Sequence, residues 1–552
     1  MLLSIFFQLF LFMNMINQDY ADLVLINGKI HTMEDKNPFV EAIAIKNGII
    51  IKIGSNEVIK KYIGEKTKVV DCKNKLILPG FIDNHTHFVY GGFQIQGINL
   101  RVAKSRNEFV NIIKDFAEKN NGQWITGGDW DHEAWEDSRL PNKEMIDFCT
   151  KETPVFVTRF DGHMGLANSY ALKLAKIDKD TKDPEGGTIV RDPITKEPTG
   201  ILKDEAMNLV FSVIPPPNKE QRKQAILTAL KHASELGVTS IQDVSSIEDV
   251  ELYRELEKEN LLTLRIYSRI PIESYKYLIE NNIKITDKTE GLIKLGALKA
   301  FADGSIGSST AWFFDRYEED ISNYGLAMEI LTSGKLEQYS LIADQHKLQL
   351  SIHAIGDRAI SEVLDIFEKI VKNNPEWDRR FRIEHAQHLN PKDFVRFKKL
   401  NVIASCQPYH CIDDGQWVSK RIGLERCKYT YAFKSFLDNS IILTFGSDWT
   451  VAPLNPLEGI YAAVTRSTLD DKNPDGWFPE QKISVEEAVK CYTINNAYAS
   501  FEENLKGSIK EGKLADIIIL SDDIFEISPF KIKDVKVIMT IFNGKIIYEA
   551  LF

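Results

Sequence analysis

The feature that most constrains the fold of this chain is a series of eight short apolar runs that alternate with longer, helical stretches. The runs are ILPGFIDNHTH (77–87), GVTSIQDV (237–244), LLTLRIYSRI (261–270), LGALKAFADG (295–304), LQLSIHAIGD (348–357), RFRIEHAQ (380–387), NVIASCQP (401–408) and SIILTFGSD (440–448). Eight strand–helix repeats are typical of a parallel sheet that closes on itself inside a ring of helices. We therefore predict an α/β fold centred on a (β/α)8 TIM barrel at residues 80–504.

The distinctive polar residues of these runs lie late in their predicted strands. They are His85, His87, Lys299, His353, His385 and Asp448. In a barrel of this kind the active site lies on the face formed by the carboxyl ends of the strands, here called the mouth. The sequence therefore predicts that all six side chains converge on one mouth.

The pair His85 and His87 is the strongest indication of chemistry. Side chains alternate along a strand, so residues two apart point the same way. Two imidazoles on one face of an apolar run are difficult to satisfy without a cation. A lone histidine such as His353 is more often a hydrogen-bonded core residue, but together with His385 and Asp448 the pair predicts a metal centre.

Lys299 is an amine within an apolar strand, where an unpaired charge is costly to bury. One interpretation is a salt bridge to Asp303 or Glu384. The other is that the neutral amine has reacted with carbon dioxide, giving a carbamate whose two oxygens bridge two metal ions.

Two further regions flank and interrupt the barrel. Residues 21–79 and 505–552 are rich in short β-type runs, and neither piece could bury a core alone, so we predict one composite β-sandwich from both chain ends. Residues from about 95 to 230 exceed what a strand–helix connection needs and are predicted to form an inserted cap over the mouth. Alternatively, TPVFVTRFDG (153–162) is itself a barrel strand.

Residues 1–20 begin with an apolar leader, MLLSIFFQLFLFMNMI. Three interpretations remain open: a secretory signal or anchor, an extension ahead of a true start at Met13 or Met15, or a buried strand. The first predicts a secreted or endomembrane protein, and the others a cytoplasmic one. No later stretch is long and apolar enough to cross a bilayer, so no membrane contact is expected from the catalytic body.

Composition limits the partners of the chain. Its 552 residues carry 68 basic and 79 acidic side chains, a formal charge of −11, without a basic block, which argues against a nucleic acid partner. The six cysteines are scattered and form no C-x-x-C pair, so neither a disulfide framework nor a zinc knuckle is expected. The sequence leaves open whether the chain forms a homo-oligomer.

Several motifs together resemble the amidohydrolase superfamily, and in particular its YtcJ-like branch, which includes N-substituted formamide deformylases. They are PGFIDNHTH, KAFADGSIGSSTA, SIHAIGDRAI, RIEHAQ, SCQP, FGSDW and GKLADIIIL. The resemblance extends from about Asp22 to the C-terminus. It implies that His85 and His87 end strand 1 and that Asp448 belongs to strand 8. It also assigns Lys299, His353 and His385 to strands 4, 5 and 6.

The resemblance implies a metal-dependent hydrolase of non-peptide carbon–nitrogen bonds, most plausibly in small linear N-substituted amides. Imidazole and carboxylate ligands suit zinc, with manganese, iron or nickel as alternatives. A metal ion would activate water as hydroxide, and Asp448 would be its general base and then general acid. A cyclic-amide hydrolase, a deaminase, an ester hydrolase and, more remotely, a non-enzymatic scaffold remain alternatives.

Substrate contacts are less well defined by the sequence, because each polar residue near the mouth could equally be structural. The candidates are His163, Asn168, Asp303, Ser305, Gln407 and Trp449.

Overall fold

The computed structural model describes residues 20–550 except 121, 137, 160–162 and 286–290. The chain divides into two compact units, one from residues 1–88 and 229–552 and the other from Val89–Thr228. All of the predicted leader except Tyr20 lies outside the described residues. Among the residues that are described, no helix combines the length and apolar character needed to span a membrane.

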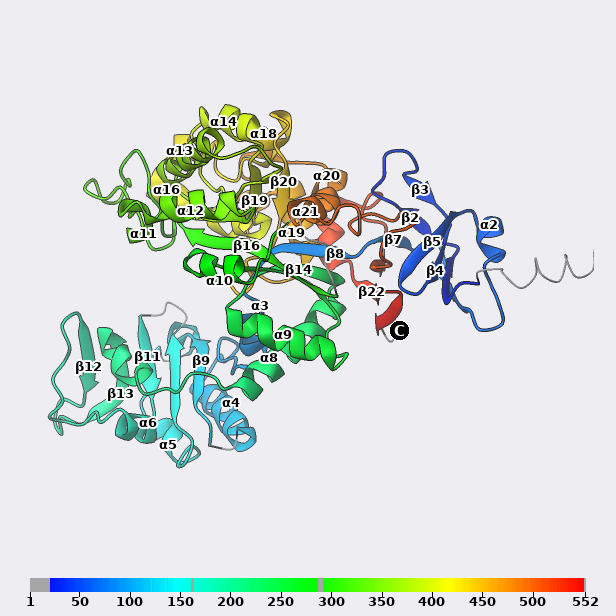
Figure 1. The fold of residues 1–552 in the computed structure, drawn as a ribbon. Helices are drawn as coiled ribbons and strands as arrows, with labels where there is room; N and C mark the ends of the chain where they lie inside the picture. Colours follow the sequence, from blue (N-terminus) through cyan, green and yellow to red (C-terminus); the bar gives the residue numbers. More distant parts are fainter. Residues whose placement is uncertain (1–19, 121, 137, 160–162, 286–290, 551–552) are drawn as a thin grey trace, which may run out of the picture. The chain divides into compact units, whose positions relative to one another are not determined.

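Eight parallel strands of the first unit form one sheet in the order β20-β19-β18-β17-β16-β15-β14-β8 (Figure 1). Their bounds are β8 (Phe81–Thr86), β14 (Val238–Val244), β15 (Arg265–Pro271), β16 (Ile293–Phe301), β17 (Gln349–Ala354), β18 (Arg382–His385), β19 (Ile403–Cys406) and β20 (Leu443–Phe445). Each predicted run supplies one strand, and the predicted TIM barrel is confirmed.

Backbone hydrogen bonds bring the two edges of this sheet together at its carboxyl end. The N–H of Asp448, just after β20, donates to the carbonyl of His85 at 2.8 Å, and the N–H of His87 donates to the carbonyl of Trp449 at 2.7 Å. The backbone hydrogen bonds that close the barrel therefore also hold three predicted ligands, His85, His87 and Asp448, next to one another.

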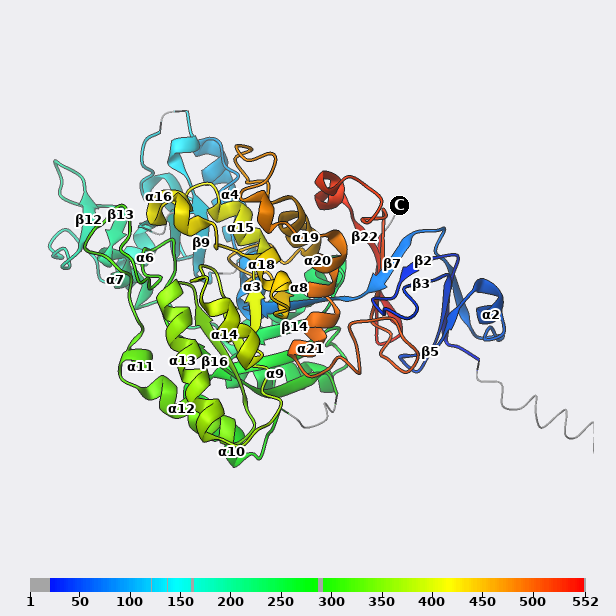
Figure 2. The same cartoon turned by 90° about the horizontal axis from the view of Figure 1, so that it is seen from above.

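Helices separate the barrel strands along the chain, and several of them pack against the outer side of the sheet (Figures 1 and 2). The longer ones are α8 (Lys219–Glu235), α9 (Ile247–Lys258), α12 (Lys335–Gln345), α13 (Asp357–Asn373), α14 (Asp393–Leu400) and α19 (Pro456–Thr465); the shorter ones include α10 (Tyr275–Glu280), α11 (Glu329–Thr332), α15 (Pro408–Asp414), α16 (Val418–Ile422), α17 (Leu424–Cys427), α18 (Phe433–Asp438), α20 (Val485–Cys491) and α21 (Ile494–Ala499). In α13, buried side chains recur every three to four residues, among them Ile360, Val363 and Phe367. That spacing gives the helix one apolar stripe against the core.

The ends of the chain form two further sheets of the first unit, the first from N-terminal strands alone and the second from strands of both ends. One has the order β5-β4-β1-β6 and the other β23-β22-β21-β7-β2-β3. The strands are β1 (Leu23–Ile26), β2 (Lys29–His31), β3 (Phe39–Val40), β4 (Ala42–Lys46), β5 (Ile49–Gly54), β6 (Lys68–Asp71), β7 (Leu76–Pro79), β21 (Ile517–Leu520), β22 (Val537–Phe542) and β23 (Lys545–Glu549), with the short helix α2 (Asn56–Lys60). Ile43, Ile77 and Ile517, from both chain ends, share one buried core.

The second unit has its own five-stranded sheet, in the order β12-β13-β11-β10-β9. Its elements are α4 (Arg106–Lys119), β9 (Ile125–Trp130), α5 (Glu144–Asp147), β10 (Val155–Arg159), β11 (Met164–Ala167), α6 (Ser169–Leu174), β12 (Gly187–Arg191), β13 (Pro198–Asp204) and α7 (Asn208–Phe211), and α3 (Phe88–Gln96) spans the start of the unit. Trp130 and Trp135 are buried against Phe109 of α4. Residues 155–159 lie in this sheet, so the alternative that they form a barrel strand is wrong.

Candidate metal centre

The six predicted ligands all lie at the carboxyl ends of barrel strands. His85 and His87 stand at the end of β8 and just beyond it, and Asp448 follows β20; Lys299, His353 and His385 lie in β16, β17 and β18. The strand positions expected for these residues therefore hold in the fold.

His85, His87 and Asp448 form a close group, with one ligand atom of each within 4.8 Å of the others. Nε2 of His87 lies 3.3 Å from Oδ1 of Asp448, and Nε2 of His85 lies 3.7 Å from the same oxygen. His85 and Asp448 are buried, whereas His87 is partly exposed. Two imidazoles and one carboxylate in this arrangement are a ligand set suited to a divalent ion.

Glu384 fixes the orientation of His85. Nδ1–H of His85 donates to Oε2 of Glu384 at 2.6 Å. Burial of Glu384 would raise its pKa, but Arg269 and Arg382, at 2.9 and 2.8 Å from Oε1, hold that pKa well below its usual range. Glu384 is thus a buried carboxylate, which leaves the lone pair of His85 on Nε2, facing Asp448.

Asp448 is held ionised in an unusual backbone conformation. Burial would raise its pKa, but His85 and a hydrogen bond with His87 lower it well below the usual range. Its φ is +58°, and that of His385 is +69°. A left-handed residue other than glycine costs on the order of 1–3 kcal/mol and is concentrated at functional sites.

The loop before Asp448 is anchored to β8. Asp83 accepts hydrogen bonds from the backbone N–H of His85 at 2.9 Å and of Ser447 at 3.0 Å. A Cβ at Gly446 would lie only 2.4 Å from Oδ1 of Asn84, so only glycine permits this close approach.

Lys299 is buried beside His85. Its Nζ lies 3.2 Å from Nε2 of His85, and burial lowers the pKa of the ammonium to about 7. Asp303 and Glu384, both described by the structure, are not within ion-pair distance of this nitrogen. The structure therefore does not support a salt bridge as the explanation for Lys299.

His353 lies beside His385, with ring centroids 4.5 Å apart. Its Nε2–H donates to the carbonyl of Gly304 at 3.0 Å. The neighbouring Asp303 accepts the backbone N–H groups of Trp312, Ile355 and Gly356 at 2.8–3.0 Å. Asp303 thus organises the loops after β16 and β17.

Gln407 contacts a predicted ligand. Its Oε1 accepts Nδ1–H of His385 at 2.8 Å, which leaves the second nitrogen of that ring as an acceptor. Burial lowers the pKa of His385 well below its usual range, so the ring is neutral.

The other predicted substrate contacts have the following partners in the structure. The Asn168 side chain caps α6 by accepting the N–H of Ala171 at 2.9 Å. His163, also in the second unit, is exposed and pairs with Asp204 at 2.9 Å. The indole of Trp449 is buried against Phe88. Roles in substrate binding for these residues stay predictions.

Two residues near the ligands, His410 and Asp83, were not predicted from the sequence, and Glu384 was considered there only as a partner of Lys299. His410 forms a second three-residue group with His385 and Asp448, while Glu384 and Asp83 hold ligand residues in place. Signals were present: Glu384 directly precedes His385, Asp83 lies two residues before His85, and His410 follows the end of the seventh strand run.

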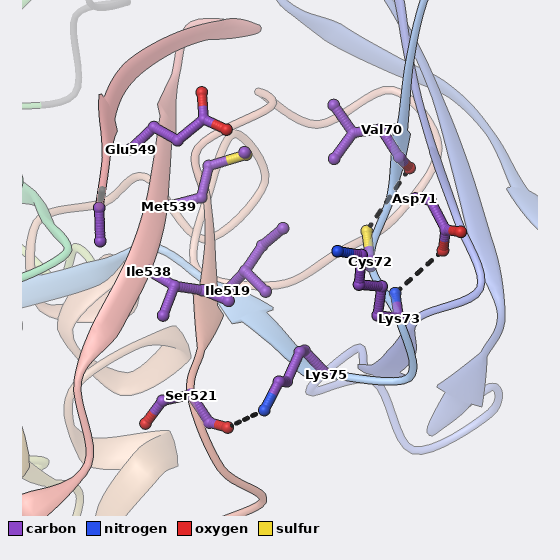
Figure 3. A pocket seen from close by; sticks show the side chains of 11 residues that line it. Val70, Asp71, Cys72, Lys73, Lys75, Ile519, Ser521, Ile538, Met539 and Glu549 are labelled. Carbon is purple, nitrogen blue, oxygen red and sulfur yellow. Dashed lines mark hydrogen bonds between the residues drawn. The ribbon is translucent and has the colours of Figure 1, made fainter. Parts of the chain in front are cut away.

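A separate pocket of about 460 Å³ lies among strands from both chain ends and is lined by residues such as Cys72, Lys75, Ile519 and Met539 (Figure 3). None of the predicted site residues lines it. We therefore place the candidate site at the barrel mouth, where His85 and His385 each have one ring nitrogen left as an acceptor near the ionised Asp448, an arrangement that fits a divalent ion.

The chain is similar to several known proteins over most of its length. The chain is 39% identical to Protein LONG AFTER FAR-RED 3 of Arabidopsis thaliana, over 96% of this chain and 92% of that protein. It is 24% identical to the N-substituted formamide deformylase of Arthrobacter pascens, over 96% and 98% of the two chains. A solved metal-dependent hydrolase from Pyrococcus furiosus, described as uncharacterized, is 28% identical, with a TM-score of 0.76 over 91% of this chain and 100% of the other.

The family comparison covers most of the chain. Residues 68–548 match the family described as "Amidohydrolase family", and the resemblance found in the motifs is confirmed. The chain therefore belongs to the amidohydrolase family.

Proposed function

We propose that this amidohydrolase cleaves carbon–nitrogen bonds in small linear N-substituted amides. The observation that carries the proposal is the group of His85, His87 and Asp448, in which Glu384 fixes one imidazole and the aspartate is ionised. The similarity to an N-substituted formamide deformylase supports this choice of substrate class.

We propose that the mouth holds two divalent ions, with zinc favoured by the imidazole ligands. The ligands would be His85, His87, His353, His385, Asp448 and Lys299. Lys299 would act as a carbamate: its neutral amine adds to carbon dioxide, forming one N–C bond and releasing one proton. Lys299 is buried and has no ion-pair partner among the residues that the structure describes, which supports this modification, since a carbamate would supply a negative charge for the two cations.

The bound ions would supply a Lewis acid that lowers the pKa of water and polarises the amide carbonyl. Asp448 would accept a proton from the attacking water and then deliver it to the nitrogen that leaves. Glu384 would keep Nε2 of His85 directed at the centre throughout, because its own charge is held by Arg269 and Arg382.

A cavity beside Lys299 suits the organic part of such a substrate. It has a volume of about 270 Å³ and is lined mainly by apolar groups, including those of Val244, Pro271, Phe301, Met328 and Ile330. Val244, Pro271 and Phe301 end barrel strands, so the cavity opens at the mouth. We propose that it receives one apolar substituent of the amide.

A substrate panel tests this function. With zinc supplied, linear formamides and acetamides bearing compact apolar N-substituents are expected to be hydrolysed faster than hydantoins, lactones or aminopurines. Removing the ions with a chelator should abolish the activity, and adding zinc should restore it. Turnover of a cyclic amide, an ester or an aminopurine alone, with every linear amide inert, would replace the proposed substrate class.

A further inference from the structure

We propose that His410 is a metal ligand, and that His385, His410 and Asp448 together bind a divalent cation beside the group of His85, His87 and Asp448. This inference rests on the metal centre of the proposed function but adds a ligand from the seventh strand position. It can be tested by metal binding alone.

The fold delivers His410 to the mouth. Strand β19 ends at Cys406, Gln407 follows, and helix α15 begins at Pro408, so His410 lies in the first turn of a helix at the carboxyl end of the seventh barrel strand. Proline at the first helical position favours a helix start at this point. One ligand atom each of His385, His410 and Asp448 lies within 4.8 Å of the others.

The donor atoms of this group suit a cation. The side-chain oxygen of Gln407 accepts a hydrogen bond from Nδ1–H of His385, so the other nitrogen of that ring keeps its lone pair. Nε2 of His410 is buried and has no hydrogen-bond partner among the residues that the structure describes. Buried polar nitrogens normally have a partner, and an orphaned one calls for an explanation such as an ion.

The two groups can be occupied together. Asp448 belongs to both, and a carboxylate has two oxygens that can each contact one ion. Each group adds two imidazoles that belong to it alone. The result is two neighbouring cation sites that share Asp448. The site formed with His385 is complete only with His410.

His388 provides a matched control. It lies three residues after His385, is buried, and also has an Nε2 without a partner in the described residues, but its Nδ1 lies 2.7 Å from Oγ1 of Thr430. It belongs to neither ligand group. A comparison of His388→Ala with His410→Ala therefore separates the effect of losing any buried imidazole from the effect of losing a metal ligand.

The test uses the full-length chain, stripped of metal and titrated with Zn²⁺. Two ions per chain are expected to bind the wild-type protein. In His410→Ala and in His410→Gln, which keeps more side-chain volume, one ion should remain tight and the other should weaken at least about tenfold, since even residues that merely support a ligand change affinity 10–100-fold. His388→Ala should keep both ions.

Wild-type affinity for both ions in either folded His410 variant, shown to be folded by circular dichroism, would overturn the proposal, as would a single site in the wild-type protein. If both ions bind as expected but no amide is cleaved, the proposed function fails while the assignment of His410 stands.

Discussion

Asp448→Asn is expected to lower kcat/KM for the best amide substrate by about 10²- to 10⁴-fold, the usual contribution of general acid–base catalysis. An amide side chain retains an oxygen for the ions but cannot shuttle a proton. Asparagine also tolerates positive φ better than most residues, so the backbone at +58° should be preserved. Steady-state kinetics of the zinc-loaded variant, beside its metal content and circular dichroism spectrum, measures the effect.

The metal content separates the two roles of Asp448. Loss of turnover with nearly full metal content would assign the residue to proton transfer. A rate close to that of the wild-type enzyme would place the catalytic base elsewhere, with His163 as the next residue to test.

Lys299→Ala is expected to remove most activity and at least one ion. The variant loses the anion that would lie between two cations, and leaving net positive charge in a buried mouth is costly. Short carboxylates such as acetate or propionate, supplied with excess zinc, should restore part of the activity by entering the vacated space. Kinetics and metal analysis with and without the carboxylate measure both effects.

Lys299→Arg is the matched control. A guanidinium remains charged and does not form a stable carbamate, and it fills the space that acetate would use, so carboxylates should not rescue this variant. A mass spectrum of the wild-type protein taken without acid should show the added carbon dioxide. Full activity in Lys299→Ala with a single occupied ion would instead indicate a mononuclear hydrolase.

The barrel could be predicted from the sequence because each of its strands is a short apolar run. The alternation of side chains along a strand also placed His85 and His87 on one face without any tertiary information. In contrast, residues 155–159 have the same apolar character as a barrel strand, and pairing with β9 and β11 places them in another sheet. The local pattern of apolar residues predicts that a segment is a strand, but the pairing of that strand with distant strands determines which sheet it joins.

The finer parts of the site depend on contacts between distant residues. Glu384 orients His85 across 299 positions of sequence, and the left-handed backbone at Asp448 follows from hydrogen bonds to β8. His410 joins the ligands only because a helix begins directly after β19. The position of these residues next to ligand motifs is visible in the sequence, but the contacts that they make with distant residues are not.

The metal content of the purified full-length protein and of a His85→Ala, His87→Ala double variant tests the central claim, a metal-dependent catalytic centre at the barrel mouth, most directly. The account predicts close to two divalent ions per wild-type chain and the loss of at least one in the folded double variant, together with its amide hydrolysis. Unchanged metal content in the double variant would contradict the account.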